Sequence, residues 1–430
     1  GAVGERGESV ALGLFVGAGS IVLMAWTFLL ALRVRALEPL FGGMDRVYRA
    51  HRWAGSLAAV LMFLHVRIEP EIENGILGAS RSVAEAAESL AGVGEIMLYV
   101  LVVLSVVRTL PYRIWRWTHK LMGVPFAFAS WHFFTAEKPY ENTSAWGLWF
   151  GAVMSVGLVS YLARVFVRDP LLRGAKHRIV SSQVEGDLVS IYLAPERAKL
   201  DFEPGQFAFV RIDRPGLREP HPLSIASSPD EPDLRFVVKT GGDWSTTLGA
   251  ADLAGASVAV EGPYGMFEPL GRRGQRSVCI GAGVGITPFL GAIANVDPNE
   301  GDVPCVLYGY RGSGSITIVD ELRRAESEGR IRLQLFDSAR GERMSPDSLR
   351  ALFDSLQGAH VALCGPDSMV RQMERAARSL GASDIHYEAF DIRSGVGPER
   401  STQIQGAMGR ARETARSRMT EWLSARVQRA

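Results

Sequence analysis

The chain has 430 residues, a length that suits two or three domains. Its 47 Lys and Arg residues are balanced by 46 Asp and Glu residues, so it lacks the basic excess expected of a nucleic-acid-binding protein. The three cysteines, Cys279, Cys305 and Cys364, have no paired spacing, which argues against disulfides and a zinc site and fits a reducing compartment.

Long apolar runs are confined to the first 168 residues, and they predict five membrane crossings. The expected crossings cover residues 9–32, 48–68, 90–107, 118–134 and 146–167. Lys and Arg cluster on one side of these runs and carboxylates on the other. By the positive-inside rule, the C-terminal two thirds lie in the cytoplasm and the N-terminus outside. Glu95, inside the third run, indicates either a proton path or a carboxylate that snorkels to the interface.

Two of these runs carry a histidine near each end. His51 and His65 are fourteen residues apart, about 20 Å along a helix, and lie within about 40° of one face. His119 and His132 are thirteen residues apart, which on an ideal helix places them on different faces. Because Pro125 between them must break a backbone hydrogen bond, we predict a kink or an overwound turn that restores a common face.

The four histidines suggest two haem sites. Histidine is expensive in hydrocarbon and is usually functional there. Imidazoles on two facing helices can hold two b-type haems, one between His51 and His119 and the other between His65 and His132. Four hydrogen-bonded core histidines are the alternative. The chain has only 8 histidines, and the paired spacing of these four favours haem.

From residue 176 the pattern changes to short alternating strands, which predict a small antiparallel β-barrel. The expected strands cover 177–180, 188–193, 206–211 and 234–239. Residues 240–248 contain two glycines followed by hydroxyl residues at a helix start. This arrangement offers free backbone N–H groups to phosphate oxygens, and Lys239 adds a positive charge.

The next region predicts a doubly wound parallel α/β sheet. Expected strands at 277–280, 305–310, 331–335 and 361–364 alternate with helices near 320–328, 346–356 and 367–380. The glycine-rich loop at 281–288 departs from the ordinary G-x-G-x-x-G dinucleotide fingerprint. Arg311, Arg340 and Arg343 follow strands, where arginines can bind a 2′-phosphate and favour NADPH over NADH. Solvated surface arginines are the alternative.

After residue 394, apolar residues recur at helical spacing with arginines between them. They predict an amphipathic C-terminal helix that lies on the membrane, on the protein or on a second copy of the chain. A homo-oligomer is therefore one of the expected arrangements.

Several motifs together resemble the transmembrane NADPH oxidase and ferric reductase superfamily, in a compact bacterial form. They are the two histidine pairs, His221-Pro222-Leu223-Ser224, the loop from Gly281 to Pro288, and Cys364-Gly365-Pro366. The soluble motifs are also similar to those of ferredoxin-NADP reductases. The resemblance spans residues 9 to 393 and implies a multi-domain protein. The expected parts are a transmembrane di-haem domain at 1–170, an FAD-binding barrel at 171–273, an NAD(P)H-binding α/β domain at 274–393 and the C-terminal helix at 394–430.

The resemblance also implies roles for individual residues. Ser224 is expected near flavin N5, Cys364 beside the nicotinamide and Phe390 against the flavin face, and these three are the expected catalytic residues. The expected FAD and NADPH contacts are His221, Pro222, Leu223, Ser224, Lys239, Ser245, Thr246, Thr247, Gly281, Gly283, Gly285, Thr287, Arg311, Arg340, Cys364, Gly365, Pro366 and Phe390. The expected haem ligands are His51, His65, His119 and His132.

The implied activity is electron transfer through the cell membrane, from cytoplasmic NADPH through FAD and both haems to an extracytoplasmic acceptor. That acceptor is oxygen, giving superoxide, or ferric iron. The superfamily usually has six membrane helices, so the first is expected to be missing here. Glu69 occupies a position where the oxidases tend to carry another histidine, which favours ferric iron. Delivery of electrons to quinone or a periplasmic partner is the alternative within enzymes. A proton channel, or a membrane anchor with a vestigial reductase domain, is the alternative from another class.

Overall fold

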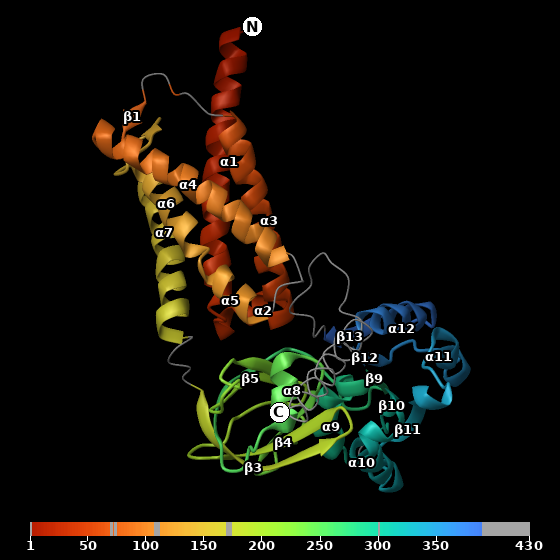
Figure 1. The fold of residues 1–430 in the computed structure, drawn as a ribbon. Coiled ribbons are helices and arrows are strands. Elements are labelled where there is room, and N and C mark those ends of the chain that lie inside the picture. The colour runs from red at the N-terminus through yellow and green to blue at the C-terminus, as the bar shows by residue number, and fades with distance from the viewer. Residues whose placement is uncertain are drawn as a thin grey trace, which may run out of the picture. The chain divides into compact units, whose positions relative to one another are not determined.

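A computed structural model of the chain describes residues 2–68, 72, 75–106, 112–168, 174–299 and 302–388 (Figure 1). The predictions for Glu69, Phe390 and the C-terminal helix lie outside these residues. The structure divides into two compact units. Up to Ile392, the first unit takes in Gly1–Ile21 and Ala59–Leu148, and the second takes in Val22–Ala58 and Trp149–Ile392.

The N-terminal part is helical, as its apolar runs predict. Its described elements are α1 (Ala2–Ala31), η1 (Arg35–Leu37), α2 (Glu38–Phe41), α3 (Met44–Ile68), α4 (Arg81–Val106), α5 (Tyr112–Lys120), α6 (Gly123–Thr135), α7 (Ala145–Leu162) and the π-helical continuation η2 (Ala163–Arg168). Two short strands, β1 (Ile76–Leu77) and β2 (Glu137–Lys138), pair antiparallel.

Three described helical segments are long and apolar enough to cross a membrane: Glu8–Ala31, Arg81–Val106 and Ala145–Val167. They correspond to three of the five predicted crossings. The helix α3 has 25 residues, but its histidines and arginines make it less apolar than these segments. The second histidine run is divided into α5 and α6, which have only 9 and 13 residues.

The interruption between α5 and α6 is the overwound turn predicted near Pro125. At this junction the backbone N–H groups of Leu121, Met122 and Val124 each donate to a carbonyl three residues back, not four. Pro125 has no N–H with which to bond the carbonyl of Leu121 four residues before it, and Val124 donates to that carbonyl instead. The prediction of a local break in this segment is therefore confirmed.

A curled antiparallel sheet follows. Its strands are β3 (Ala175–Glu185), β4 (Leu188–Pro195), β5 (Phe207–Ile212), β6 (His221–Ser224), β7 (Leu234–Lys239) and β8 (Ser257–Tyr264), in the order β6-β5-β8-β3-β4-β7. An isolated bridge between Ile225 and Phe236 brings the two edges together. Alternate residues of β4, such as Val189, Ile191 and Leu193, are fully buried and form the interior with their neighbours. The helix α8 (Asp243–Ala250) follows β7.

The last described region is a five-stranded parallel sheet. Its strands are β9 (Ser277–Ala282), β10 (Cys305–Tyr310), β11 (Arg332–Asp337), β12 (His360–Cys364) and β13 (Asp384–Glu388), in the order β11-β10-β9-β12-β13. The connecting helices are α9 (Thr287–Ala294), α10 (Ile316–Ser327), α11 (Pro346–Leu352) and α12 (Asp367–Ser379), with 3-10 turns η3 (Gly283–Ile286), η4 (Gly312–Ser315) and η5 (Ser338–Arg340).

Helices cover both faces of this parallel sheet. Cys279 of β9 packs in a cluster with residues of α9 and α10, while Val278 and Ile280 pack in a second cluster with residues of α11 and α12. A strand that is buried on both faces forms a continuous apolar run in the sequence. Most of these strands could therefore be predicted. The doubly wound fold predicted for this region is confirmed.

Candidate functional site

The segment 22–58 packs on the antiparallel sheet within the second unit. Met44 and Val47 of α3 share a buried apolar cluster with Phe209 of β5. The carboxylate of Glu38 accepts a hydrogen bond from the backbone N–H of Gly265 at 2.7 Å, and this bond is buried. These contacts hold the start of α3 against the sheet and so position the side chains that follow along the helix.

A cavity of about 250 Å³ gathers residues from distant parts of this unit. It is lined by Asp45, Tyr48, Arg49, Arg52, Phe207, Pro222, Leu223, Ser224, Val237, Val238, Lys239, Val284, Thr287 and Glu388. Five of these, Pro222, Leu223, Ser224, Lys239 and Thr287, are predicted flavin or nucleotide contacts. The structure therefore brings together residues that the sequence places more than sixty positions apart.

Ser224 has the chemistry of a ligand contact. Pairing of β6 with β5 sets it opposite Phe207, and only 5% of the residue is exposed. Its Oγ atom has no hydrogen-bond partner among the described residues. A buried hydroxyl left in this state costs about 1–3 kcal/mol, so a polar ligand atom in the cavity would satisfy it. A flavin ring nitrogen fits this need.

Glu388 is a functional candidate that the sequence analysis missed. It ends β13, it is 8% exposed, and its Oε2 has no partner in the described part of the chain. Burial, together with the negative charges of Asp45 and Glu38, raises the pKa of Glu388 to about 8. The group therefore holds a proton at neutral pH. Only Phe390 was named from the sequence in this part of the chain, and no strand was predicted that would end at Glu388.

The expected phosphate site at α8 differs from the prediction. The backbone N–H groups of Gly241 and Gly242 are not free, because both donate to Ser245 Oγ, at 3.1 and 3.0 Å. Thr246 N–H bonds the carbonyl of Gly242, and the Thr247 hydroxyl donates into the first turn of its own helix. Local capping by Ser245 competes with anion binding here, so a pyrophosphate would have to replace that hydroxyl.

Two further predicted flavin contacts already have partners. Lys239 Nζ lies 3.3 Å from Asp187 Oδ2 and both side chains are exposed. The imidazole of His221 stacks on the indole of Trp244, with ring centroids 4.1 Å apart and planes at 27°. Trp244 belongs to α8, so this stacking ties β6 to the helix that follows β7.

The glycine-rich loop lies at the carboxyl ends of β9 and β12, where the strand order reverses. Ligands of doubly wound sheets bind at this point. Gly283 has φ of +56°, and a Cβ on Gly285 would lie 2.4 Å from the carbonyl oxygen of Cys364. Both positions require glycine. The Thr287 hydroxyl donates to the carbonyl of Val284 at 2.8 Å and closes the turn.

Cys364 occupies the last position of β12 and pairs with Gly281 of β9. Its side chain is fully buried in an apolar cluster, and burial raises the pKa of its thiol well above the ordinary value. It is not among the residues that line the cavity. Gly365 turns the chain with φ of +156°, and Pro366 is the N-cap of α12.

The predicted 2′-phosphate arginines follow their strands, but a carboxylate lies beside them. Arg311 directly follows β10, and Arg340 ends η5 after β11. Asp337, the last residue of β11, is buried, and its Oδ1 accepts from the N–H groups of Gly312 and Ala339 at 2.9 Å. The bond from Gly312 lowers the pKa of Asp337. Its Oδ2 lies 3.6 Å from Arg340 Nε, so this strand end carries both signs of charge.

The histidines of α3 are anchored by carbonyls of α1. His51 Nδ1 lies 2.9 Å from the carbonyl oxygen of Thr27, and His65 Nδ1 lies 2.9 Å from that of Gly13. Because a carbonyl only accepts, each Nδ1 carries the proton and Nε2 carries the lone pair that an iron requires. A Cβ on Gly17 would lie 2.6 Å from His65 Nδ1, so this glycine makes room for the ring.

The second histidine run also has properties of a haem site. His132 Nδ1 is buried without a hydrogen-bond partner in the described residues. His119 Nδ1 lies 3.0 Å from Ser105 Oγ. Oriented imidazoles with a defined tautomer suit bis-histidine haem ligation. The sequence did not indicate Thr27, Gly13 or Ser105, because their role depends on which helices pack together.

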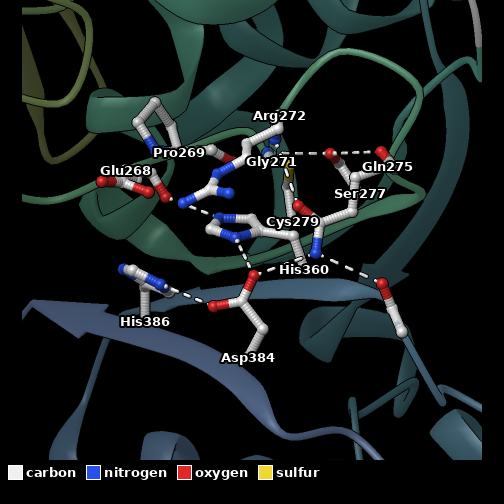
Figure 2. A network of polar contacts seen from close by, with 11 residues as sticks. Glu268, Pro269, Gly271, Arg272, Gln275, Ser277, Cys279, His360, Asp384 and His386 are labelled. Atoms are coloured by element: carbon white, nitrogen blue, oxygen red, sulfur yellow. Dashed lines mark hydrogen bonds and ion pairs between the residues drawn. The ribbon is translucent and has the colours of Figure 1, made fainter.

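A separate polar cluster joins the end of the antiparallel sheet to the parallel sheet (Figure 2). His360 is 1% exposed; its Nδ1 lies 3.0 Å from Asp384 Oδ2, and its Nε2 lies 2.9 Å from the carbonyl of Glu268. His386 and Gln275 also bond Asp384. Partial burial raises the pKa of Asp384, but the hydrogen bonds from His360, His386 and Gln275 outweigh it, so the pKa is lower than usual.

This cluster also satisfies the distance requirement for a metal site. Ligand atoms of Glu268, His360 and His386 lie within 4.8 Å of one another. Both ring nitrogens of His360 are already engaged by acceptors, so a metal would have to displace one of these bonds. These hydrogen bonds explain the cluster as a structural link that connects the two sheets.

Comparison with known families and proteins agrees with this geometry. Residues 16–130 match the family described as ferric reductase like transmembrane component, 175–268 an FAD-binding domain and 279–375 an oxidoreductase NAD-binding domain. The chain is 30% identical over 250 residues to the reductase component of propane 2-monooxygenase from Mycolicibacterium smegmatis, covering 52% of this chain and 71% of that protein.

Two other relatives are a ferric reduction oxidase and a ferredoxin reductase. Ferric reduction oxidase 2 of Arabidopsis thaliana is 24% identical over 334 residues, covering 73% of this chain and 44% of that protein. Ferredoxin--NADP reductase B of Sorangium cellulosum is 29% identical over 210 residues, covering 44% of this chain and 86% of that protein. The chain therefore combines a ferric reductase like transmembrane domain with FAD-binding and NAD-binding domains of the ferredoxin-NADP reductase type.

Proposed function

We propose that this protein carries electrons across the cell membrane, from cytoplasmic NADPH through FAD and two b-type haems to an acceptor on the other side. The observation that supports this most is the position of α3. Tyr48, Arg49 and Arg52 line the cavity that contains Ser224, and His51 lies between them in the same helix. One helix thus contributes both to the proposed flavin cavity and to the proposed inner haem.

The cavity residues have distinct proposed tasks. When bound, FAD accepts a hydride from NADPH and passes electrons one at a time to the haem irons. Ser224 offers its unpartnered hydroxyl to the flavin ring, and Glu388 holds a proton at the same cavity. Gly283 and Gly285 let the nucleotide approach the loop. Phe390 is proposed to cover the flavin face until the nicotinamide replaces it.

Cofactor preference depends on the ends of β10 and β11. Arg311 and Arg340 support binding of a 2′-phosphate and hence NADPH. Asp337 opposes it, because a carboxylate at this position repels a phosphate and suits the ribose hydroxyl of NADH. We propose NADPH as the donor, with NADH accepted as well.

The histidines are proposed to hold the two haems, His51 together with His119 and His65 together with His132. Haems held by two histidines each would supply single electrons to an acceptor through the haem edge and would not need to bind it. Similarity to ferric reduction oxidase 2 and the residue Glu69 favour ferric iron over oxygen. Electron delivery to quinone or a periplasmic partner is the second candidate, since edge transfer places few demands on the acceptor.

Anaerobic reduction of the purified full-length protein tests this proposal. Addition of NADPH to protein loaded with FAD and haem should produce the reduced haem α-band, and protein without FAD should not respond. A flavin that is reduced while the haems stay oxidised would contradict the proposed order of carriers. Ferric-chelate reduction, measured against superoxide-dismutase-sensitive cytochrome c reduction, then identifies the acceptor.

A further inference from the structure

We infer that Ser105 is a positioning residue for His119, and that it determines how strongly this imidazole donates electrons to its haem iron. The inference deepens the proposed function and rests on it, because it requires His119 to be a haem ligand. Ser105, Leu101, Trp115 and His119 all belong to the first compact unit.

The direction of the hydrogen bonds around Ser105 is defined by its neighbours. Ser105 Oγ lies 2.7 Å from the carbonyl oxygen of Leu101 and 3.0 Å from His119 Nδ1. A hydroxyl has one proton, and a carbonyl can only accept, so that proton goes to Leu101. Ser105 Oγ must then accept the proton of His119 Nδ1. His119 is therefore the tautomer whose lone pair is on Nε2, the nitrogen that would face iron.

Trp115 adds a second link between the same residues. Its indole Nε1 donates to the backbone carbonyl of Ser105 at 3.1 Å. Its ring stacks on the imidazole of His119, with centroids 5.2 Å apart and planes at 13°. Ser105 thus holds Trp115 through its backbone and His119 through its side chain, and the stacked rings support each other. Rotation of the imidazole would break the hydrogen bond and the stacking together.

The anchor of His119 differs from those of the other histidines. His51 and His65 donate to backbone carbonyls, and His132 Nδ1 has no partner in the described part of the chain. The Nδ1 bond of His119, in contrast, ends on the side-chain oxygen of Ser105. A hydroxyl that donates to a carbonyl becomes a better acceptor through polarisation along the chain of bonds. The Leu101–Ser105–His119 chain therefore gives the imidazole partial imidazolate character.

A serine that bonds the carbonyl four residues back is common in helices and by itself indicates nothing about haem. Ser130 of α6 provides the matched control. Its Oγ donates to the carbonyl of Phe126 at 2.8 Å, and no hydrogen bond joins it to a histidine among the described residues. Both serines are partly buried in the first unit, so replacing them removes the same helix bond. Only the Ser105 variant also removes the acceptor of an imidazole proton.

Redox titration of the two haems in the full-length protein tests the inference. Ser105→Ala should keep both haems and raise the midpoint potential of one of them, since a less anionic imidazole stabilises ferric iron less. The other haem should keep its potential. Ser105→Thr retains the hydroxyl and should restore the wild-type value. Ser130→Ala should leave both potentials unchanged. Low-temperature EPR should show a changed g-tensor for the same single haem.

Other results of these measurements would overturn either the inference or the proposed function. Unchanged potentials in Ser105→Ala, or equal shifts of both haems, would overturn the inference. If Ser105→Ala loses a haem, Ser105→Cys keeps the side-chain size with a weaker acceptor, and a wild-type potential in that variant would overturn the inference. Wild-type protein that binds no haem would reject the proposed function instead, so the two failures are distinguishable.

Discussion

Three of the haem-ligand candidates, His51, His65 and His119, differ from the cavity residues in where their polar atoms find partners. His51 and His65 bond carbonyls through Nδ1, which orients each ring and leaves the second nitrogen for a ligand. Ser224 and Glu388 each bury an oxygen with no partner in the described residues. The comparison teaches that a satisfied atom orients a ligand group, whereas an unsatisfied buried atom marks where a ligand itself has to bind.

The largest effect is expected at a haem ligand. His65→Ala should remove one of two haems and abolish reduction of the extracytoplasmic acceptor, because no other described group replaces the imidazole. Oxidation of NADPH by artificial acceptors that take electrons from the flavin should continue. Haem-to-flavin ratios and the two activities measure this outcome. Equal loss of both activities would show that the haems and the flavin do not form one ordered chain.

A smaller effect is expected at Ser224, whose Oγ lacks a hydrogen-bond partner in the described residues. Ser224→Ala should slow flavin reduction by NADPH about 100-fold, the cost of losing one preorganised hydrogen-bond donor. Stability should not fall, since the hydroxyl has no hydrogen-bond partner to lose among the described residues. Stopped-flow absorbance at the flavin band measures the rate.

Ser245→Ala is the contrasting variant for this position. That hydroxyl accepts from Gly241 and Gly242, so its loss should lower the stability of the protein by about 1 kcal/mol. If Ser224→Ala reduces flavin at the wild-type rate, Ser224 is not a flavin contact.

The raised pKa of Glu388 predicts that the stability of the protein depends on pH. The folded protein raises the pKa of Glu388 from 4.5 to about 8, so it binds this proton more tightly than the unfolded chain does. The contribution of Glu388 to the free energy of unfolding is complete below its ordinary pKa and falls as pH rises toward 8. The loss between pH 6 and 8 should be about 2 kcal/mol, since one pKa unit is worth about 1.4 kcal/mol.

Glu388→Gln keeps the shape of the side chain and removes the titration. Thermal unfolding of the purified protein at pH 6 and pH 8 should therefore show a smaller decrease in this variant than in the wild type. Parallel decreases in the two proteins would mean that Glu388 titrates normally.

The smallest expected effect concerns NADPH and NADH. Asp337→Asn keeps the acceptor for Gly312 and Ala339 and removes a negative charge. The ratio of kcat/KM for NADPH to that for NADH should rise about fivefold, the upper end of what one ion pair at a protein surface contributes. Asp347→Asn is the control, because Asp347 also pairs with an arginine three residues on, at 2.9 Å. An equal change in both variants would exclude Asp337 as a specificity residue.

Much of the fold could be predicted from the sequence because its signals are local. Strands buried on both faces are apolar runs in the sequence. Pro125 lacks a backbone N–H whatever its helix packs against. The strand β13, with residues Asp384 to Glu388, was not predicted. It lies at the sheet edge and its polar residues break the apolar pattern.

The candidate site was only partly predictable, because partners of polar atoms depend on tertiary packing. The four histidines and Ser224 were located by spacing and motif. The carbonyl of Thr27, the hydroxyl of Ser105 and the carboxylate of Asp337 acquire their roles only when segments separated in the sequence meet. Ser245 shows the opposite error: a local cap occupied N–H groups that the pattern left for phosphate.

Quantification of haem in the purified full-length protein tests the central claim most directly. The account predicts two b-type haems per flavin-binding chain, both with the six-coordinate low-spin EPR signals of bis-histidine ligation, and only one such haem in His65→Ala. A chain that binds flavin but no haem, or binds a five-coordinate high-spin haem, would contradict the account.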